Sequence, residues 1–259
     1  MSLAQRLRAL LKALEGAVDV HTHLGADRAF NERLIALFKM LGVSRIYASY
    51  YPYDFSSMRP PSEEVWRGNE VVLRYQRREG LVRGFVHVNP LNPDAVKMAE
   101  FFLKEGMRGI KIYRAVRAVH PSLEPIYELA KQYSVPVLIH TAHRLYPRDR
   151  PNESDSRHVA QAAKRNPNVV FIMAHIGGGG DWEYAVRAVK ELSNVYADIG
   201  GSVADNSMVE YAVEVMGPDR VLFGSDNIVW AALAKIASAE LPDDVKAKIL
   251  RENAERIGL

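Results

Sequence analysis

The segment VVFIMAH, residues 169–175, is a short apolar run that ends in a histidine. β-Branched and aromatic residues without polar interruption favour a strand that is buried on both faces, as in a parallel sheet. Similar apolar runs recur along the chain, at residues 17–20, 45–49, 83–88, 109–113, 135–139, 169–174, 195–199 and 221–224. The sequence therefore predicts eight short strands.

Longer segments with helical spacing of their apolar residues separate these runs. They occupy residues 31–41, 63–79, 93–104, 124–133, 157–165, 182–192 and 208–216. Alternation of strands and helices over 259 residues predicts an α/β fold, a single (β/α)8 TIM barrel in one domain spanning residues 1–259. A doubly wound open sheet is the alternative, and eight even units favour closure of the sheet.

The first fifteen residues have leucines at helical spacing. Leu3, Leu7, Leu10, Leu11 and Leu14 predict an N-terminal amphipathic helix over residues 2–15 that covers the bottom of the domain. A basic membrane-surface helix is the alternative, although packing against the core explains the leucines equally well. Arginine and lysine are mixed into the leucines, unlike in a signal peptide, so we expect a cytoplasmic protein.

Composition narrows the function classes. The chain is 48% hydrophobic and 25% charged, and no apolar run is long enough to span a bilayer. It has no cysteine, so any metal must be bound by histidine, aspartate, glutamate or a modified lysine. The net charge of +3 is too small to indicate nucleic-acid binding. We expect a small-molecule substrate, no nucleic-acid or membrane partner, and leave a homodimer open.

Polar residues stand at the ends of several predicted strands. His21 and His23 end the first strand, and side chains two residues apart on a strand point to the same face. Alone, such a pair is more often hydrogen-bonded than metal-bound. However, His140, His175 and Asp226 end the fifth, sixth and eighth strands. Four imidazoles and a carboxylate buried at one rim are costly unless a cation binds them, so the pattern predicts a divalent metal.

Seven motifs together resemble one family of enzymes. They are VDVHTHLG at 18–25, GIKIY at 109–113, PVLIHT at 136–141, FIMAHIGG at 171–178, NVYADIGG at 194–201, RVLFGSD at 220–226 and ENAERIGL at 252–259. The chain resembles the amidohydrolase superfamily of TIM-barrel metal-dependent hydrolases, specifically the amidohydrolase 2 branch, which is related to aminocarboxymuconate semialdehyde decarboxylase. The resemblance covers almost the whole chain.

This resemblance implies a role for each residue at the ends of the strands. His21, His23, His140 and Asp226 match the ligands of a site with one divalent metal ion. Nitrogen-rich ligation favours zinc, with manganese or another divalent ion as the alternative. His175 matches the catalytic histidine of the family, and Asp226 is also expected to accept a proton during catalysis.

Three further positions are less clear. Many relatives have an aromatic residue and proline where this chain has Asn227 and Ile228, which makes the substrate uncertain. Lys111 stands where binuclear members of the superfamily place a carboxylated lysine between two metals. Because the closer branch usually works with one metal, we favour a lysine that balances charge or binds a substrate carboxylate.

Arginines near the predicted mouth of the barrel suggest an anionic substrate. Arg114, Arg117, Arg144 and Arg148 make the adjoining loops basic, and Arg144 is a candidate substrate-binding residue. Elsewhere, His87, His143 and His158 are interpreted as structural or solvent-exposed histidines, and Asp198 as a residue next to the ligands that is a candidate to orient a ligand imidazole.

The main functional prediction is hydrolysis. A metal-bound hydroxide would attack an amide, ester or lactone and break a C–N or C–O bond, with His175 polarising the carbonyl oxygen. The first alternative is a metal-dependent lyase, a decarboxylase or hydratase of an unsaturated carboxylic acid. Two others are a TatD-like phosphodiesterase, disfavoured because such proteins have a glutamate where Lys111 stands, and a non-catalytic binding barrel.

Overall fold

The computed structural model describes residues 12, 14–51, 58–142, 152–178 and 181–259. Its centre is a sheet of eight parallel strands that pair in sequence order from β1 to β8. The strands are β1 (Val18–Leu24), β2 (Arg45–Tyr50), β3 (Val82–Val88), β4 (Gly109–Ile112), β5 (Val137–Ile139), β6 (Phe171–Met173), β7 (Val195–Asp198) and β8 (Val221–Leu222).

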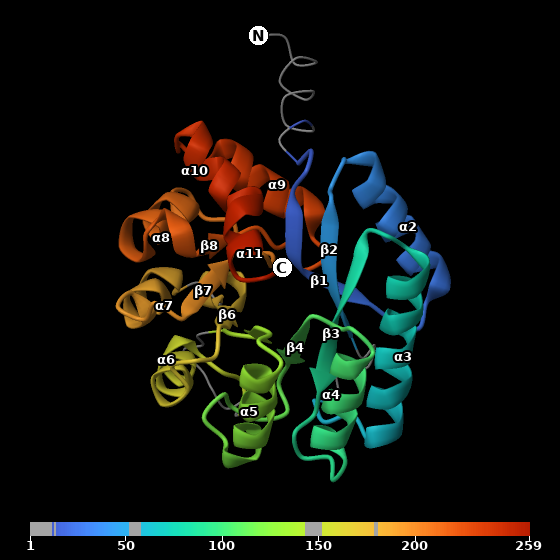
Figure 1. Cartoon of the computed structure of the whole chain (residues 1–259). Helices are drawn as coiled ribbons and strands as arrows, with labels where there is room; N and C mark the ends of the chain where they lie inside the picture. The colour runs from blue at the N-terminus through green and yellow to red at the C-terminus, as the bar shows by residue number, and fades with distance from the viewer. Residues whose placement is uncertain (1–11, 13, 52–57, 143–151, 179–180) are drawn as a thin grey trace.

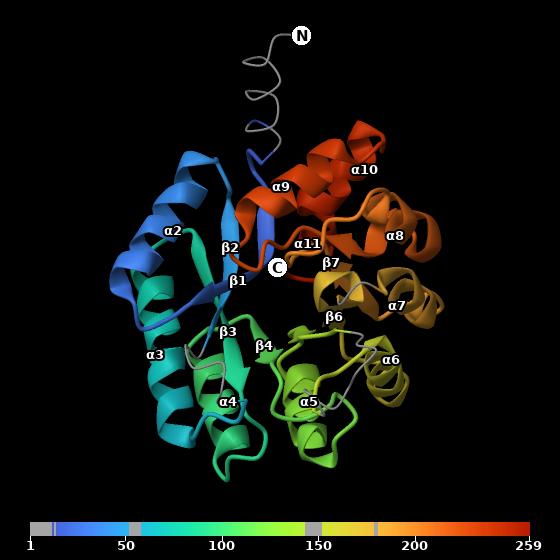
Figure 2. The same ribbon diagram turned by 180° about the vertical axis from the view of Figure 1, so that it is seen from behind.

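Helices surround the strands on all sides (Figure 1). They are α2 (Arg28–Met40), α3 (Ser62–Arg78), α4 (Ala95–Lys104), α5 (Glu124–Gln132), α6 (Ser156–Arg165), α7 (Trp182–Val189), α8 (Met208–Met216), α9 (Val229–Ser238), α10 (Asp243–Ala247) and α11 (Asn253–Arg256). Seen from behind, α2 to α4 lie on one side of the ring and α6 to α8 on the other (Figure 2). The prediction of a TIM barrel is confirmed, and the open-sheet alternative is wrong.

Hydrogen bonds between β1 and the segment that directly follows β8 close the barrel. The Val20 amide donates to the Phe223 carbonyl at 3.0 Å, and the Asp226 amide donates to the His21 carbonyl at 2.7 Å. The register of β1 shifts between Asp19 and Thr22, which marks a bulge. Bulges re-aim side chains, and His21, the first predicted metal ligand, lies within this irregular stretch.

Two hydrophobic layers hold the barrel together. The larger layer joins the outward faces of the strands to the helices, as alternation along buried strands requires. The smaller layer fills the barrel itself and includes Val20, Phe85 and Leu138. Leu259, only 2% exposed, belongs to this inner layer, so the end of the chain closes one end of the barrel (Figure 1).

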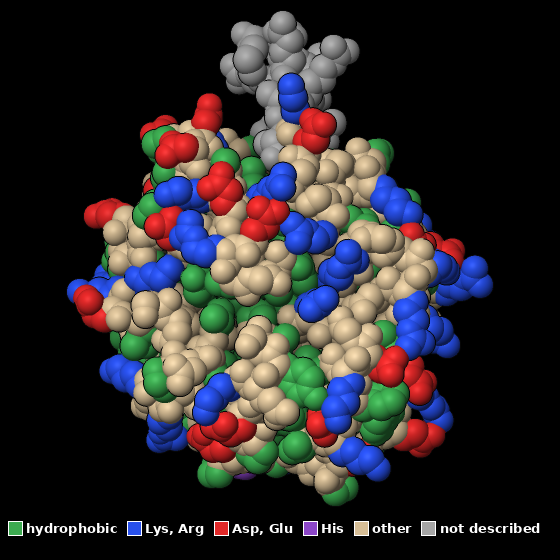
Figure 3. Space-filling model, in the orientation of Figure 1, with side chains coloured by type: hydrophobic (Ala, Val, Ile, Leu, Met, Phe, Trp, Pro, Cys, Tyr) green, Lys and Arg blue, Asp and Glu red, His purple; other side chains and the backbone are tan. Residues whose placement is uncertain are grey.

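The surface carries both signs of charge. On the face shown in Figure 3, lysine and arginine side chains lie among aspartate and glutamate, and histidine is almost absent. Such mixing is typical of a solvated surface. In the described part of the chain, no helix combines the length and the apolar character needed to cross a bilayer. The predicted helix over residues 2–15 lies mostly outside the described residues and stays a prediction.

Candidate metal centre

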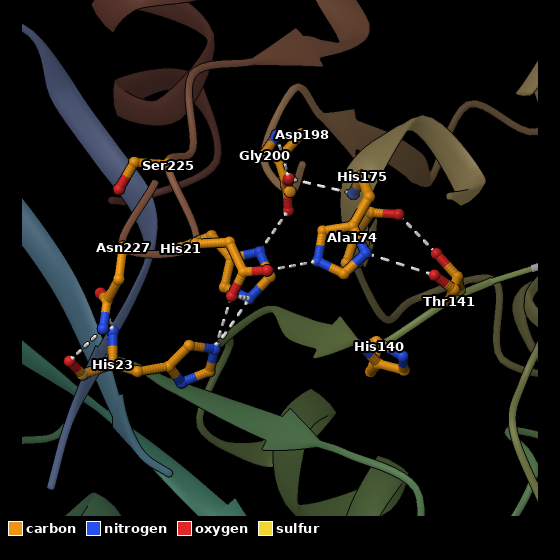
Figure 4. A network of polar contacts seen from close by, with 12 residues as sticks. His21, His23, His140, Thr141, Ala174, His175, Asp198, Gly200, Ser225 and Asn227 are labelled. Atoms are coloured by element: carbon orange, nitrogen blue, oxygen red, sulfur yellow. Dashed lines mark hydrogen bonds and ion pairs between the residues drawn. The ribbon is translucent and has the colours of Figure 1, made fainter. Parts of the chain in front are cut away.

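Four polar side chains meet where β1, β6 and β8 end. Asp226 Oδ1 lies 3.0 Å from His23 Nε2 and 3.5 Å from His21 Nε2, and Asp226 Oδ2 lies 3.1 Å from His175 Nε2 (Figure 4). The two Nε2 atoms of His21 and His23 are 3.2 Å apart. Ligand atoms of His21, His175 and Asp226 all lie within 4.8 Å of one another, a spacing that suits one metal ion.

The other ring nitrogens of His21 and His175 face away from this cluster. His21 Nδ1 lies 3.0 Å from Asp198 Oδ2, and His175 Nδ1 lies 3.3 Å from the Thr141 carbonyl oxygen. Both oxygens can only accept, so Nδ1 carries a proton in each ring and Nε2 is the ring nitrogen turned toward the cluster. Asp198 therefore orients His21, a role for which the sequence made it a candidate.

Burial keeps the rings of the β1 histidines neutral. It lowers the pKa of His21 to about 4, with the neighbouring Lys111 adding to the effect, and it also lowers the pKa of His23. Burial acts in the opposite direction on Asp226, but contacts with the imidazoles outweigh it and hold the pKa of that carboxyl well below its usual range. With the rings neutral, a cation among these nitrogens and the carboxylate would supply the positive charge that such a buried group needs. The donor set therefore fits a divalent metal ion.

The backbone at the cluster has unusual torsion angles. His175 and Ile176 have φ angles of 62° and 51°, and Asp226 and Asn227 have 52° and 63°. Left-handed conformations cost on the order of 1 kcal/mol or more for residues with a Cβ, and they persist where surrounding contacts hold them. One such contact is the hydrogen bond from the His175 amide to Asp198 Oδ1, at 3.1 Å.

A buried carboxyl group links β1 to the segment after β8. Asp19 Oδ1 accepts hydrogen bonds from the amides of His21 at 3.0 Å and Ser225 at 3.1 Å. Burial raises the pKa of Asp19 to about 7. Asp19 thus fixes the residue before Asp226 against the first histidine of the cluster, a role that the sequence analysis missed.

His140, a predicted ligand, contacts other residues. Its Nε2 atom lies 2.9 Å from Glu153 Oε1 and 2.9 Å from Arg114 Nε, and Arg114 is ion-paired with Glu153 at 3.0 Å. In Figure 4 it stands beside His175 with no contact drawn to the cluster, and the centres of these two rings are 5.1 Å apart. Its role as a ligand stays a prediction. Glu153 was missed because its long loop has no periodic pattern.

Lys111 lies against the cluster. It is 1% exposed, and its Nζ atom is 2.9 Å from His21 Nε2. Burial lowers the pKa of Lys111 to about 8. The structure thus brings Lys111 to the site. The roles expected for it, in balancing charge, binding a substrate carboxylate or bridging two metals, stay predictions. Arg144, the other predicted substrate residue, lies outside the described residues.

A cavity of about 420 Å³ opens onto the cluster. Its described lining is His23, Leu24, Gly25, Asp27, Phe30, Tyr51, Tyr113, Arg114, His140, Asp226, Asn227 and Ile228. The hydroxyls of Tyr51 and Tyr113 are 3.2 Å apart, and the Arg114 guanidinium lies 4.8 Å from the centre of the Tyr113 ring. An apolar and aromatic cavity with a few polar groups is typical of a small-molecule site.

Two of the histidines interpreted as structural are described. His158 hydrogen-bonds with Asp155 in the capping box that begins α6. His87 lies buried in β3, where burial lowers its pKa to about 3. The structural interpretation fits the contacts of His158. His143 lies outside the described residues.

Comparison with known proteins gives a family match. The sequence model of a protein family, described as amidohydrolase, matches residues 18–257, which is nearly the whole chain. No curated protein sequence matches the chain.

Solved structures share the fold at low sequence identity. 2,6-Dihydroxybenzoate decarboxylase from Rhizobium is 15% identical with a TM-score of 0.75, over 94% of this chain and 98% of that one. Dihydroxybenzoic acid decarboxylase from Polaromonas sp. JS666, solved with manganese and the inhibitor 2-nitroresorcinol, is 16% identical with a TM-score of 0.74, over 94% and 96%. 4-Oxalomesaconate hydratase from Rhodopseudomonas palustris is 18% identical with a TM-score of 0.62, over 93% and 95%.

These structures correct the main functional prediction. The expected attack of a metal-bound hydroxide on an amide, ester or lactone is wrong, because the named reactions of these neighbours are decarboxylation and hydration. Both are lyase reactions, and they match the alternative that the sequence analysis kept. The error arose because lyases and hydrolases can share ligands and fold, so these features do not identify the reaction.

Proposed function

The chain belongs to the amidohydrolase family, and from this premise we propose that it is a metal-dependent lyase, a decarboxylase or hydratase of an aromatic or unsaturated carboxylic acid. The observation that carries the proposal is the meeting of His21, His23, His175 and Asp226 beside a cavity lined by aromatic side chains. The neighbours that decarboxylate or hydrate such acids support it.

We propose that His21, His23 and Asp226 hold one divalent ion, with His140 as the fourth ligand. To bind, His140 Nε2 would exchange its contact with Glu153 for the ion. Three imidazole ligands favour zinc. Manganese is the second candidate, because a structural neighbour was solved with manganese bound. When bound, the ion supplies positive charge that attracts the substrate carboxylate and stabilises developing negative charge.

His175 is suited to moving a proton. Decarboxylation replaces a carboxylate by a proton, and hydration adds a proton and a hydroxyl group, so both reactions need a proton carrier. The Thr141 carbonyl holds the Nδ1 proton of His175, which leaves Nε2 to exchange a proton. Asp226 Oδ2, at 3.1 Å from that atom, can share the proton with it. Such a carrier typically contributes about 100- to 10,000-fold in rate.

The cavity favours a flat acid. Phe30, Tyr51 and Tyr113 provide aromatic walls, and Arg114 is the one lysine or arginine among the described residues that line it. An arginine can bind a carboxylate or phenolate through two parallel hydrogen bonds. Because the Arg114 guanidinium is held by Glu153 and stacks on Tyr113, its orientation is already fixed before a substrate binds. We propose that Arg114 binds a second acidic group of the substrate.

The test is a substrate panel on metal-loaded protein. Dihydroxybenzoates, hydroxylated benzoates with a second carboxylate, and unsaturated dicarboxylates are compared with lactones and anilides. Carbon dioxide release and ultraviolet spectra measure turnover. We expect turnover of one or more acids, lost in Asp226→Ala, with a raised KM in Arg114→Gln. Hydrolysis of a lactone or anilide with no reaction of any acid would contradict the proposal.

A further inference from the structure

A buried lysine lies behind the metal cluster. Lys235, on α9, is 6% exposed, and its Nζ atom donates to the carbonyls of Ile199 at 2.8 Å, Gly200 at 2.9 Å and Gly201 at 3.0 Å. An ammonium group has three N–H donors, so all three are used on consecutive carbonyls. A charge this deep in the protein is costly without such partners, which makes the position of Lys235 specific.

The backbone of residues 199–201, whose carbonyls bind Lys235, lies against the cluster. The Gly200 amide donates to Asp198 Oδ1 at 2.8 Å, the same oxygen that accepts from the His175 amide. Figure 4 shows Gly200 and Asp198 together above His21 and His175. A Cβ atom on Gly200 would lie 2.8 Å from Asp198 Oδ1 and 3.3 Å from Asp226 Cβ, so no side chain fits between this backbone and the site.

Gly201 lies close to the ring of His175, the candidate catalytic residue. Its φ angle is +74°, and a Cβ atom there would lie 3.1 Å from Cδ2 of the His175 ring. The His175 ring therefore packs against backbone at Gly201 that carries no side chain. If this backbone moved away from the ring by about a few tenths of an ångström, the ring would gain room to tilt away from Asp226.

Charge adds to this arrangement. Burial lowers the pKa of Lys235 to about 8, while the negative charges of Asp198, Asp226 and Asp205 act in the opposite direction and favour the charged ammonium. The ammonium in turn favours the ionised carboxylates that orient His21 and complete the candidate metal site. Lys235 therefore acts on the site through backbone position and through charge.

We infer that Lys235 is a positioning residue, which holds backbone 199–201 against His175 and Asp226 and so fixes the geometry of the metal site. The inference rests on the proposed function in one respect, that the cluster binds a divalent ion. A lysine with a merely structural role would lower the stability of the fold without changing the geometry of a bound ion.

The experiment uses cobalt(II) as the probe, because its visible absorption reports coordination geometry without any substrate. Lys235→Met keeps the length of the side chain and removes its donors and its charge. Gly201→Ala leaves Lys235 intact and pushes on His175, and through it on the candidate ligand Asp226, whose Oδ2 atom lies 3.1 Å from His175 Nε2. Lys248→Met is the control, since it loses an ion pair with Asp219, at 3.0 Å, that lies at the amino end of β8.

We expect Lys235→Met to weaken cobalt binding about 10- to 100-fold and to change the cobalt spectrum, as loss of an orienting contact does. Gly201→Ala should change the spectrum in the same way, and the effects of the two substitutions should not add in the double variant. Lys248→Met should leave both readouts unchanged.

Two results would overturn the inference, and they separate it from the proposed function. An unchanged spectrum and affinity in Lys235→Met would make Lys235 structural. If that variant does not fold, an unchanged spectrum in Gly201→Ala would equally rule out the positioning role. Wild-type protein that binds no cobalt would overturn the metal proposal and this inference together. Altered cobalt geometry in both variants, with no lyase activity in wild-type protein, would support the inference while the proposed reaction fails.

Discussion

The side chain of Asn227 pairs with the backbone of His23 through two hydrogen bonds, as a residue of a neighbouring strand would. Asn227 Oδ1 accepts from the His23 amide at 2.9 Å, and Asn227 Nδ2 donates to the His23 carbonyl at 2.9 Å. A carboxamide thus extends the pairing of β1 beyond the end of β8. Asparagine tolerates the left-handed φ of 63° found here better than most residues do. The contact fixes the distance between His23 and the neighbouring Asp226.

Asn227→Ala should therefore weaken metal binding. The substitution removes both hydrogen bonds to His23 and leaves the two candidate ligands less well aligned. We expect about a 10- to 100-fold rise in the dissociation constant for zinc, measured by competition with a chelating dye.

Asn69 provides a matched control for this prediction. Its carboxamide pairs in the same way with His87 on β3, accepting from the amide at 2.9 Å and donating to the carbonyl at 3.0 Å. His87 is not a predicted ligand, so Asn69→Ala should lower stability and leave metal affinity unchanged. Equal loss of metal in both variants would show that Asn227 acts only through general stability.

Metal content should decide whether His140 is a ligand. Purified wild-type protein should contain close to one equivalent of a divalent ion, and Asp226→Ala and His140→Ala should lose it. Mass spectrometry of the metal content measures both. Because His140 Nε2 lies 2.9 Å from Glu153, Glu153→Gln is the informative companion and should retain the ion. Full occupancy in His140→Ala would exclude His140 as a ligand.

His175→Asn should retain most of the metal and lose turnover. If His175 carries a proton, the expected loss is about 100- to 10,000-fold in kcat on any acid that reacts. The measurement pairs steady-state kinetics with metal analysis of the same sample. Loss of metal would instead make His175 a ligand, which its place 3.1 Å from Asp226 Oδ2 also permits.

Lys111→Met should leave the metal stoichiometry at one. The Lys111 ammonium lies 2.9 Å from His21 Nε2, where its charge opposes a second cation. Elemental analysis measures the stoichiometry, and the intact mass of the wild-type protein tests for carboxylation. A mass increase corresponding to added carbon dioxide, together with two metal ions per chain, would show a binuclear site.

Gly68→Ala should destabilise the barrel. Alanine normally improves a helix by up to about 1 kcal/mol, but here its Cβ atom would lie 2.1 Å from the ring of Tyr50. Overpacking of this kind costs about 1–3 kcal/mol, so the clash should outweigh the helical gain. Thermal unfolding measures the difference, and Gly80→Ala, with nothing within 4 Å of the new atom, should be close to neutral.

The sequence predicted the barrel because its signal is local and repeated. Apolar runs and helical spacing indicate most elements, and most observed strands fall within or close to the predicted ranges, although β1 (Val18–Leu24) extends beyond its predicted end at residue 20. Several are shorter than predicted, such as β6 (Phe171–Met173), because the chain turns sharply at His175. Strand ends in a parallel barrel share one rim, so residue position alone brought His21, His23, His175 and Asp226 together.

Contacts between distant segments were decided only by the tertiary structure. Nothing local to Glu153, Lys235 or Asn227 indicates that they meet His140, the 199–201 backbone and His23, because the partners lie 13 to more than 200 residues away in the sequence. The same reason explains the incorrect prediction of hydrolysis. Ligand types follow from position on the strands, whereas the reaction depends on how irregular loops pack around the substrate, and loops have no periodicity from which packing can be deduced.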